Sequence, residues 1–555
     1  MAITLKKLSS LEKVFLNQEP SPKSTLVGSI LKNERFSFQI AYYIEEHDIF
    51  KYPYIKVMAD NDFGGCVRIR TVGNVPSELP AYPGSENDDY ITTKPGLFPD
   101  PLFALTDRQV KSVTGQWRSL WVDFTPDENT AAGVYHITVK FMIGDSEEIG
   151  RAEHCLEVID ALLPKQELIH TEWFHYDCLG THYGVKMLSE QHWILIERYL
   201  KTAVEHGINM ILTPLFTPPL DTQVGGERPT VQLVGVTVEN GQYSFDFTKL
   251  KRFMDLCLKI GVQYFEMSHL FTQWGAVAAP KIVAYVDGTE KRIFGWETDA
   301  VGPEYKHFLD CFLKDLVVSL KNWGLSEKCW FHVSDEPSLA HLEGYRTAKQ
   351  TMEKHLKDFN MMDALSDFDF YEKGLVKTPI PANDHIEPFI DAGIKGLWTY
   401  YCCSQNKKVS NRFIAMPSRR NRIIAPQLYK YDIAGFLQWG YNFWYTQYAI
   451  KAINPYYVTD AGCAFPSGDA FMVYPGEDGY PVESIRLQVF SEALYDLRAM
   501  KLLESLTSKE FVMSIIEEGD GNGMTFSEYP RDEQYIINIR NRINEEIKNR
   551  FFEFI

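Results

Sequence analysis

The chain has 555 residues and a formal net charge of −18. A chain of this length exceeds what one hydrophobic core supports, so we expect two or three domains. The negative charge argues against nucleic acid or an anionic membrane as the main partner. The nine cysteines show no CxxC spacing, which argues against a structural zinc site and against a disulfide framework. We therefore predict neither a metal nor a cofactor.

The first residues include two lysines but no long apolar run, so they do not resemble a signal peptide. No later apolar run reaches the length that a membrane-spanning helix needs. These features predict a cytoplasmic protein that does not use a membrane, unless a signal peptide has been trimmed from the chain.

Residues 1–160 have the pattern of an all-β domain. Short runs of alternating apolar and polar residues are separated by turn residues, which is typical of a β-sandwich. Expected strands begin at Phe36, Tyr54, Ser119 and Gly133. Residues 73–107 are rich in Pro, Gly and Asp, and they predict one long irregular loop that packs against another part of the molecule.

Residues 161–505 alternate apolar strands with amphipathic helices, which indicates a parallel α/β fold. Eight such strands predict a (β/α)8 barrel of the TIM type. The expected strands lie at 167–176, 208–214, 262–269, 329–334, 361–366, 394–401, 433–440 and 470–474. Residues 506–555 are charged and mostly helical in pattern. The predicted fold class is therefore multidomain, with a β-sandwich, a barrel and a helical C-terminal tail.

The fourth expected barrel strand ends in two adjacent carboxylates, Asp335 and Glu336. Phe331 and Val333 are typical of a buried strand, and Pro337 ends the ladder because it has no N–H to donate. Barrel enzymes carry their active sites at the C-terminal ends of the strands. Two interpretations are open, a catalytic pair or acidic residues favoured by the dipole of the following helix.

The other expected strand ends supply aromatic rings, amides and a few acids. Rings stack on the apolar faces of a neutral sugar, and amides and acids bind its hydroxyls, whereas each aromatic taken alone fits core packing equally well. We expect the substrate-binding residues to be His175, Asp177, His269, Trp274, Trp398, Tyr400, Trp439, Asn442 and Asp469.

The adjacent acids restrict the chemistry of a glycosidase. A retaining enzyme with a protein nucleophile often carries it on the seventh strand, and the segment 433–442 has no carboxylate. An inverting pair needs a separation that neighbouring residues do not readily provide. Substrate assistance remains, in which the 2-acetamido oxygen of the sugar attacks C1. Glu336 would then act as acid and base, and Asp335 would accept the acetamido N–H.

Several segments resemble the glycoside hydrolases of family 123, the β-N-acetylgalactosaminidases. The similarity covers about residues 30–500, and the segments that carry it are 96–102, 330–337, 433–444, 468–476 and 484–488. The resemblance implies an N-terminal β-sandwich, a (β/α)8 barrel and substrate-assisted hydrolysis with retention. It also implies that Asp335 orients the acetamido group and stabilises positive charge, while Glu336 is the acid/base.

Two alternatives stay open at this point. One is a β-N-acetylhexosaminidase with another epimer preference, because the sequence does not show which residues meet O4. The other is a non-catalytic protein that binds glycans on the same scaffold. The presence of both Asp335 and Glu336 favours an enzyme with a glycan or glycoconjugate substrate.

Overall fold

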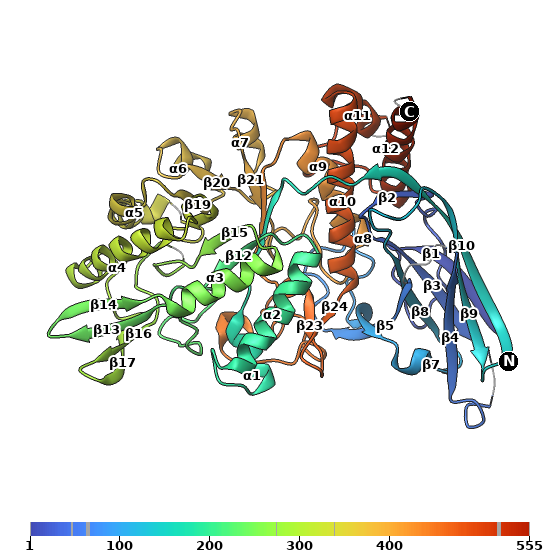
Figure 1. Ribbon diagram of the computed structural model, residues 1–555, viewed down its shortest axis with the longest axis horizontal. Coiled ribbons are helices and arrows are strands. Elements are labelled where there is room, and N and C mark those ends of the chain that lie inside the picture. The colour runs from blue at the N-terminus through green and yellow to red at the C-terminus, as the bar shows by residue number, and fades with distance from the viewer. Residues whose placement is uncertain are drawn as a thin grey trace.

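The computed structural model describes residues 2–45, 48–62, 67–273, 275–337, 339–518 and 523–553. Figure 1 shows a β-sandwich on one side and a strand barrel surrounded by helices on the other. The long helix α10 (Ile485–Leu506) and the C-terminal helix α12 (Glu533–Glu553) stand between these two parts. None of the described helices is long and apolar enough to cross a membrane.

The sandwich consists of two five-stranded sheets. In order across the first sheet, the strands are β1 (Ile3–Ser9), β3 (Phe36–Ile44), β8 (Trp117–Phe124), β5 (Val67–Ser77) and β6 (Gly96–Ala104). In order across the second, they are β2 (Ser29–Lys32), β10 (Glu147–Leu162), β9 (Gly133–Ile143), β4 (Tyr54–Asn61) and β7 (Gln109–Lys111). Nearly every residue of β3 and β8 is buried, because one face meets the second sheet and the other faces the barrel side.

The prediction that residues 73–107 form one long irregular loop is wrong in part. Its first residues complete β5, and residues 96–104 form β6, which pairs antiparallel with β5. The three prolines of these two strands obscured the pattern, since proline lacks the N–H that a ladder needs. Proline is tolerated in β6 because this strand is at the edge of its sheet.

The barrel contains eight parallel strands, which confirms the predicted fold class. They are β11 (Ile169–Glu172), β12 (Met210–Thr213), β15 (Tyr264–Met267), β18 (Cys329–Phe331), β19 (Asn360–Ala364), β20 (Thr378–Ile380), β21 (Trp398–Tyr400) and β22 (Gly435–Gln438). The sheet closes between β20 and β21, where the Tyr400 N–H donates to Pro381 O at 3.1 Å. Gly435 in β22 allows a close approach, because a Cβ there would meet the Trp398 ring.

The expected strand at 470–474 is not part of the barrel. Residues Val473–Pro475 (β23) instead form a hairpin with β24 (Pro481–Glu483). The missing barrel strand is β20, whose central residue is Pro379 and which Pro381 follows, so its sequence looks like a loop. As a result, β22 is the eighth strand and lies opposite β18, the fourth.

Helices cover the outside of the barrel (Figure 1). Those not yet given are α1 (Tyr176–Tyr183), α2 (Glu190–Glu205), α3 (Thr248–Ile260), α4 (Pro303–Asn322), α5 (Leu342–Leu356), α6 (Phe368–Glu372), α7 (Glu387–Asp391), α8 (Ser418–Arg422), α9 (Ile424–Lys430) and α11 (Lys509–Glu517). A small outer sheet adds β14 (Gln242–Asp246), β13 (Gly235–Glu239), β16 (Ile282–Val286) and β17 (Thr289–Phe294). Ser189 and Ser484 cap α2 and α10 by accepting hydrogen bonds from backbone N–H groups.

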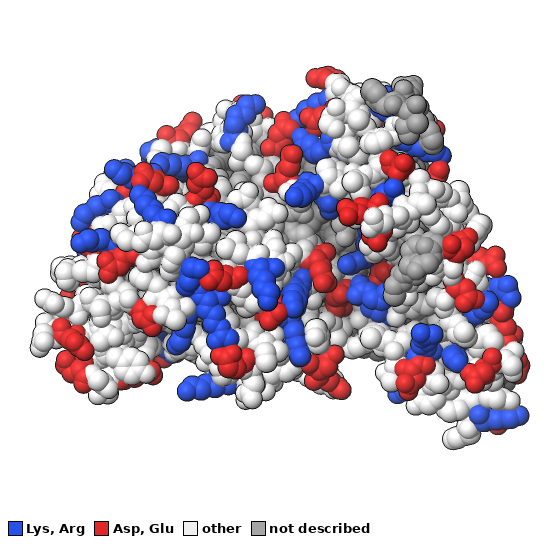
Figure 2. All heavy atoms as spheres, in the orientation of Figure 1, with Lys and Arg blue, Asp and Glu red and all other residues white. Residues whose placement is uncertain are grey.

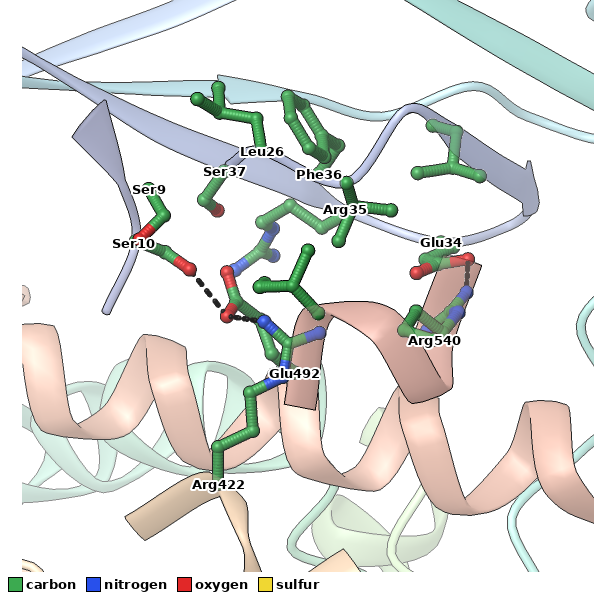
Figure 3. A pocket seen from close by; sticks show the side chains of 13 residues that line it. Ser9, Ser10, Leu26, Glu34, Arg35, Phe36, Ser37, Arg422, Glu492 and Arg540 are labelled. Atoms are coloured by element: carbon green, nitrogen blue, oxygen red, sulfur yellow. Dashed lines mark hydrogen bonds and ion pairs between the residues drawn. The ribbon is translucent and has the colours of Figure 1, made fainter. Parts of the chain in front are cut away.

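Buried ion pairs join the sandwich to the barrel side. Figure 3 shows a small cavity in this interface. Its volume is about 20 Å³. There the Ser10 hydroxyl donates to Glu492 at 2.6 Å, and Arg422 donates to the same carboxylate at 2.7 Å. Ile485 and Val489 of α10 also belong to the sandwich core. The domain boundaries at residues 160 and 505 therefore stay a prediction.

The ion pair between Asp100 in β6 and Arg486 in α10 is fully enclosed. Arg486 donates to the two carboxylate oxygens of Asp100 at 3.0 and 2.9 Å, and the Tyr474 hydroxyl donates to it at 2.6 Å. Both ionic side chains are at most 2% exposed. Removing one partner of such a pair leaves an uncompensated buried charge.

We expect Asp100→Asn to lower the free energy of unfolding by ~3–5 kcal/mol, because Arg486 loses its counter-charge. Chemical denaturation followed by circular dichroism measures this change. The matched control is Asp160→Asn, which removes an exposed carboxylate paired with Lys32 and should cost less than about 1 kcal/mol. Equal losses in the two variants would contradict a special role for the interface pair.

Candidate active site

A cavity of about 220 Å³ lies at the C-terminal ends of the barrel strands. The residues around it are mostly aromatic, aliphatic or carboxylic, and they come from the ends of seven of the eight barrel strands or from the loops that follow those strands. They are Trp173, Leu220, Asp221, Gln273, Asp335, Glu336, Ala364, Tyr400, Cys402, Cys403, Ser404, Leu437, Trp439, Gln447, Tyr448 and Phe465.

The two acids predicted from the sequence, Asp335 and Glu336, both line this cavity. Asp335 is only 7% exposed, whereas Glu336 is exposed. The backbone of Glu336 is left-handed, with φ of +45°, and its N–H donates to Ala364 O at 3.2 Å. This conformation is unfavourable for a residue with a Cβ, and such strain is concentrated at functional sites.

The two carboxylates have partners from different parts of the barrel. Gln273 donates to Asp335 Oδ2 at 2.9 Å from the loop after β15. The Tyr400 hydroxyl donates to Glu336 Oε1 at 2.5 Å from the end of β21. Asp335 and Glu336 are therefore held separately, although they are neighbours in the chain.

Burial and, after it, the charge of Glu336 raise the pKa of Asp335 to about 7 against the opposing hydrogen bond from Gln273. Two carboxylates that repel each other share a proton as a unit. The pair therefore keeps one proton up to a pH of about 7.

A buried network supports the end of β18 beneath the pair. His332 Nε2 lies 2.7 Å from Glu266 Oε1, and Trp173 Nε1 donates to the same oxygen at 2.7 Å. Burial opposes protonation of His332, but the hydrogen bond to Glu266 and the charges of Glu266 and Asp363, whose carboxylate lies 3.8 Å from Nδ1, outweigh it and raise the pKa to about 10. An imidazolium therefore lies under the cavity floor, where its charge lowers the pKa of Asp335.

Of the predicted aromatic residues that the structure describes, Trp439 and Tyr400 line the cavity. Trp439 Nε1 donates to Asp469 Oδ2 at 2.9 Å, which fixes the indole. Asp469 is fully buried behind the ring, and this burial raises its pKa to about 7. Asp469 itself is not among the cavity residues.

His175, Asp177 and Asn442 form a buried layer behind the cavity. Asp177 forms an ion pair with Arg228 at 2.6 Å, and Arg228 also lies 3.1 Å from His175 Nδ1. The other ring nitrogen of His175 is 3.0 Å from Trp439 O, and Asn442 accepts the His175 backbone N–H at 2.8 Å. This arrangement means that the three residues hold the backbone behind Trp439 and do not line the cavity.

Trp398 and His269 point into the barrel interior. Trp398 is 1% exposed and packs at 5.2 Å from Trp330. His269 is 1% exposed and stacks on His332 at 4.3 Å, so neither ring reaches the cavity wall. Trp274, predicted at the third strand end, is outside the residues that the structure describes.

Gln273, Asp221 and Tyr448 line the cavity and were missed from the sequence. Asp221 and Tyr448 lie on long loops, where the rule that active-site residues follow a strand directly does not apply. Gln273 precedes the predicted Trp274, so the polar residue beside that aromatic was the only available signal.

Within the described ranges, one group of side chains is close enough together to hold a metal, namely Glu78, Asp460 and Cys463. The Asp460 carboxylate already accepts the N–H groups of Leu79 and Cys463 at 3.0 and 2.9 Å. These three residues do not line the cavity.

The comparison with family models identifies one family. Residues 173–503 match the family model of the glycoside hydrolase 123 catalytic domain. The chain is similar to the structure of a family 123 glycoside hydrolase from Clostridium perfringens, with 14% identity, a TM-score of 0.76, and coverage of 100% of this chain and 99% of that one. This likeness shows a shared fold over the whole chain.

A β-glucuronidase from Parabacteroides merdae is 10% identical with a TM-score of 0.31, covering 90% of this chain and 52% of that one. A TM-score this low does not establish a shared fold. No curated protein matches the chain. The family model covers more than half of the chain, and the resemblance read from the sequence is thereby confirmed. The chain belongs to glycoside hydrolase family 123.

Proposed function

We propose that the protein removes terminal β-linked N-acetylgalactosamine from glycans, with retention and with assistance from the 2-acetamido group. The observation that carries this proposal is the pair of adjacent carboxylates with separate partners. Asp335 is buried and anchored through one oxygen by Gln273, whereas Glu336 is exposed and oriented by Tyr400. Neighbouring residues suit adjacent atoms of one sugar better than the two faces of a glycosidic bond.

In the first step, the acetamido oxygen attacks C1 while Glu336 donates its proton to the leaving oxygen. The bond from C1 to the leaving oxygen breaks, and a bond from C1 to the acetamido oxygen forms, which gives an oxazolinium ion. Asp335 accepts the acetamido N–H and stabilises the positive charge. In the second step, Glu336 takes a proton from water and the water oxygen bonds to C1, while the bond from C1 to the acetamido oxygen breaks and the oxazolinium ring opens. Two inversions at C1 give net retention.

The cavity volume of about 220 Å³ suits a single sugar unit, which favours cleavage at the end of a glycan chain. The Clostridium perfringens relative was described in connection with glycolipid glycan hydrolysis, so glycolipid glycans are a substrate class to test here. Acidic and basic side chains are interspersed over the face in Figure 2, which gives no single-sign patch there for a highly charged partner. A hexosaminidase with another epimer preference, and a glycan-binding protein without activity, are the alternatives.

Substitutions of the two acids should have different effects on substrates with different leaving groups. Glu336→Gln removes the proton donor, so it should slow substrates with poor leaving groups by about 10²–10⁴-fold and spare activated aryl glycosides in part. Asp335→Asn should slow both classes, because orientation and charge stabilisation are needed whatever group leaves. The measurement is kcat/KM on an aryl series with and without the 2-acetamido group.

The inhibitor that matches this mechanism is a thiazoline analogue of the oxazoline, and it should bind the wild type more tightly than Asp335→Asn. Identical losses for the two variants on every leaving group would contradict the separate roles. Equal wild-type rates on plain β-galactosides would contradict assistance by the acetamido group.

The pH dependence should follow the proton shared by the pair. As the pH rises through about 7, the pair loses this proton, and kcat/KM for poor leaving groups should fall. Gln273→Leu removes a hydrogen bond that lowers the pKa of Asp335, so the alkaline limb should move to higher pH. The loss of orientation should also reduce kcat by about 10²-fold.

The control for Gln273→Leu is Gln263→Leu at an exposed position before β15, which should keep both the rate and the pH profile. The prediction is wrong if Gln273→Leu loses activity but its alkaline limb coincides with that of the wild type.

A further inference from the structure

The cavity wall formed by the loops after β12 and β15 carries a third carboxylate, Asp221. Gln273 contacts both Asp221 and Asp335 through its side-chain amide. Its oxygen accepts the Asp221 N–H at 2.5 Å, and its nitrogen donates to Asp335 at 2.9 Å. The order along this wall is therefore Asp221, Gln273 and Asp335.

Two loops fix the Asp221 carboxylate in place. The Tyr448 N–H donates to Asp221 Oδ2 at 3.0 Å, and the Gln223 N–H donates to Tyr448 O at 2.9 Å. Asp221 and Tyr448 both have left-handed backbones, with φ of +40° and +60°. The two residues are in contact, and both have a backbone conformation that is uncommon for residues with a Cβ and is concentrated at functional sites.

The Asp221 carboxylate has unused hydrogen-bonding capacity. In the part of the chain that the structure describes, Tyr448 supplies a donor to Oδ2 and no residue supplies one to Oδ1. The nearby Arg228 is engaged by Asp177 at 2.6 and 2.9 Å. Burial raises the pKa of Asp221 to about 6, so the group is ionised above that pH. An ionised carboxylate accepts hydrogen bonds only, and a donor in the cavity would satisfy it.

We propose that Asp221 is a specificity-determining residue that accepts a hydrogen bond from the sugar hydroxyl at C3 or C4. This inference rests on the proposed function. Glu336 would act at C1 and Asp335 at the C2 substituent, and the two acids have different partners, Tyr400 for Glu336 and Gln273 for Asp335. Along the wall from Asp335 past Gln273 to Asp221, the positions of the sugar ring that follow C2 are C3 and C4. The C4 hydroxyl distinguishes galacto from gluco sugars, so Asp221 would contribute to that choice.

The test compares wild type and Asp221→Asn on an aryl β-N-acetylgalactosaminide and on its 3-deoxy, 4-deoxy and 6-deoxy analogues. Asn keeps the size of Asp and tolerates a left-handed backbone. On the parent and the 6-deoxy analogue, the variant should lose about 10- to 100-fold in kcat/KM, because a hydrogen bond to a charged group is lost. On the analogue that lacks the bonded hydroxyl, the wild type has already lost this hydrogen bond. There the kcat/KM of Asp221→Asn should therefore be close to that of the wild type.

The matched control is Asp287→Asn in the exposed turn between β16 and β17, where the backbone is also left-handed with φ of +49°. This variant should keep wild-type rates on all four substrates. A second measurement needs only the wild type. Inhibition by the thiazoline analogue should strengthen as the pH rises through about 6, because Asp221 then becomes ionised. A thiazoline that lacks the hydroxyl bound by Asp221 should not show this change.

The proposal is overturned if Asp221→Asn loses the same factor on all four substrates, since no single hydroxyl is then coupled to it. Loss of all activity, activated aryl glycosides included, together with no inhibition by the thiazoline, would make Asp221 a nucleophile and also overturn it. Failure of the wild type to prefer acetamido sugars would count against the proposed mechanism instead. In that case, the same deoxy series built on the sugar that the wild type prefers would decide the role of Asp221.

Discussion

The buried carboxylate of Asp363 holds the segment on which the candidate site depends. Strand β18 ends at Phe331, so the sheet itself does not fix the residues that lead to Asp335. Asp363 takes over this function by accepting the N–H groups of Val333 and Ser334 at 2.8 and 3.1 Å. The Tyr345 hydroxyl fixes the same carboxylate at 2.5 Å. One side chain of β19 thereby replaces the missing ladder and positions the acids.

The same network sets the electrostatics of the cavity. Because Asp363 and Glu266 keep His332 protonated, a positive charge lies below two carboxylates that repel each other. The charge lowers the pKa of Asp335, while burial raises it, and the result is a pair that holds one proton near neutral pH. A carboxylate pair with one proton can supply both a base and an acid, which the proposed mechanism needs.

Buried ion pairs, together with apolar contacts from α10 and α12, join the β-sandwich to the rest of the molecule. Asp100 pairs with Arg486 next to the capped start of α10, and Glu34 pairs with Arg540 of α12. Breaking such pairs is costly, although forming them adds little net stability. The segments 96–102 and 484–488, which carried part of the family resemblance, meet at this interface.

The sequence by itself determined the fold class, the family and the pair of acids, because these follow from local patterns. Alternating strands and helices predicted a barrel, and the run from Trp330 to Pro337 marked a strand that ends in carboxylates. It placed the eighth strand wrongly, since β20 is only three residues long and contains Pro379. That strand pairs with β19 on one side, and on the other side the Tyr400 N–H of β21 donates to Pro381 O, directly after the strand.

Only the tertiary structure decided which polar residues face the cavity. His175, Asp177 and Asn442 are at strand ends as predicted, yet their hydrogen bonds to one another and to Arg228 place them behind Trp439. Asp221 and Gln273 come from two separate loops and are brought together by a single hydrogen bond. Strand periodicity reports which face of a strand is buried, but it does not report how long loops return over the barrel. That return depends on contacts between residues far apart in the chain, such as Asp221 with Tyr448.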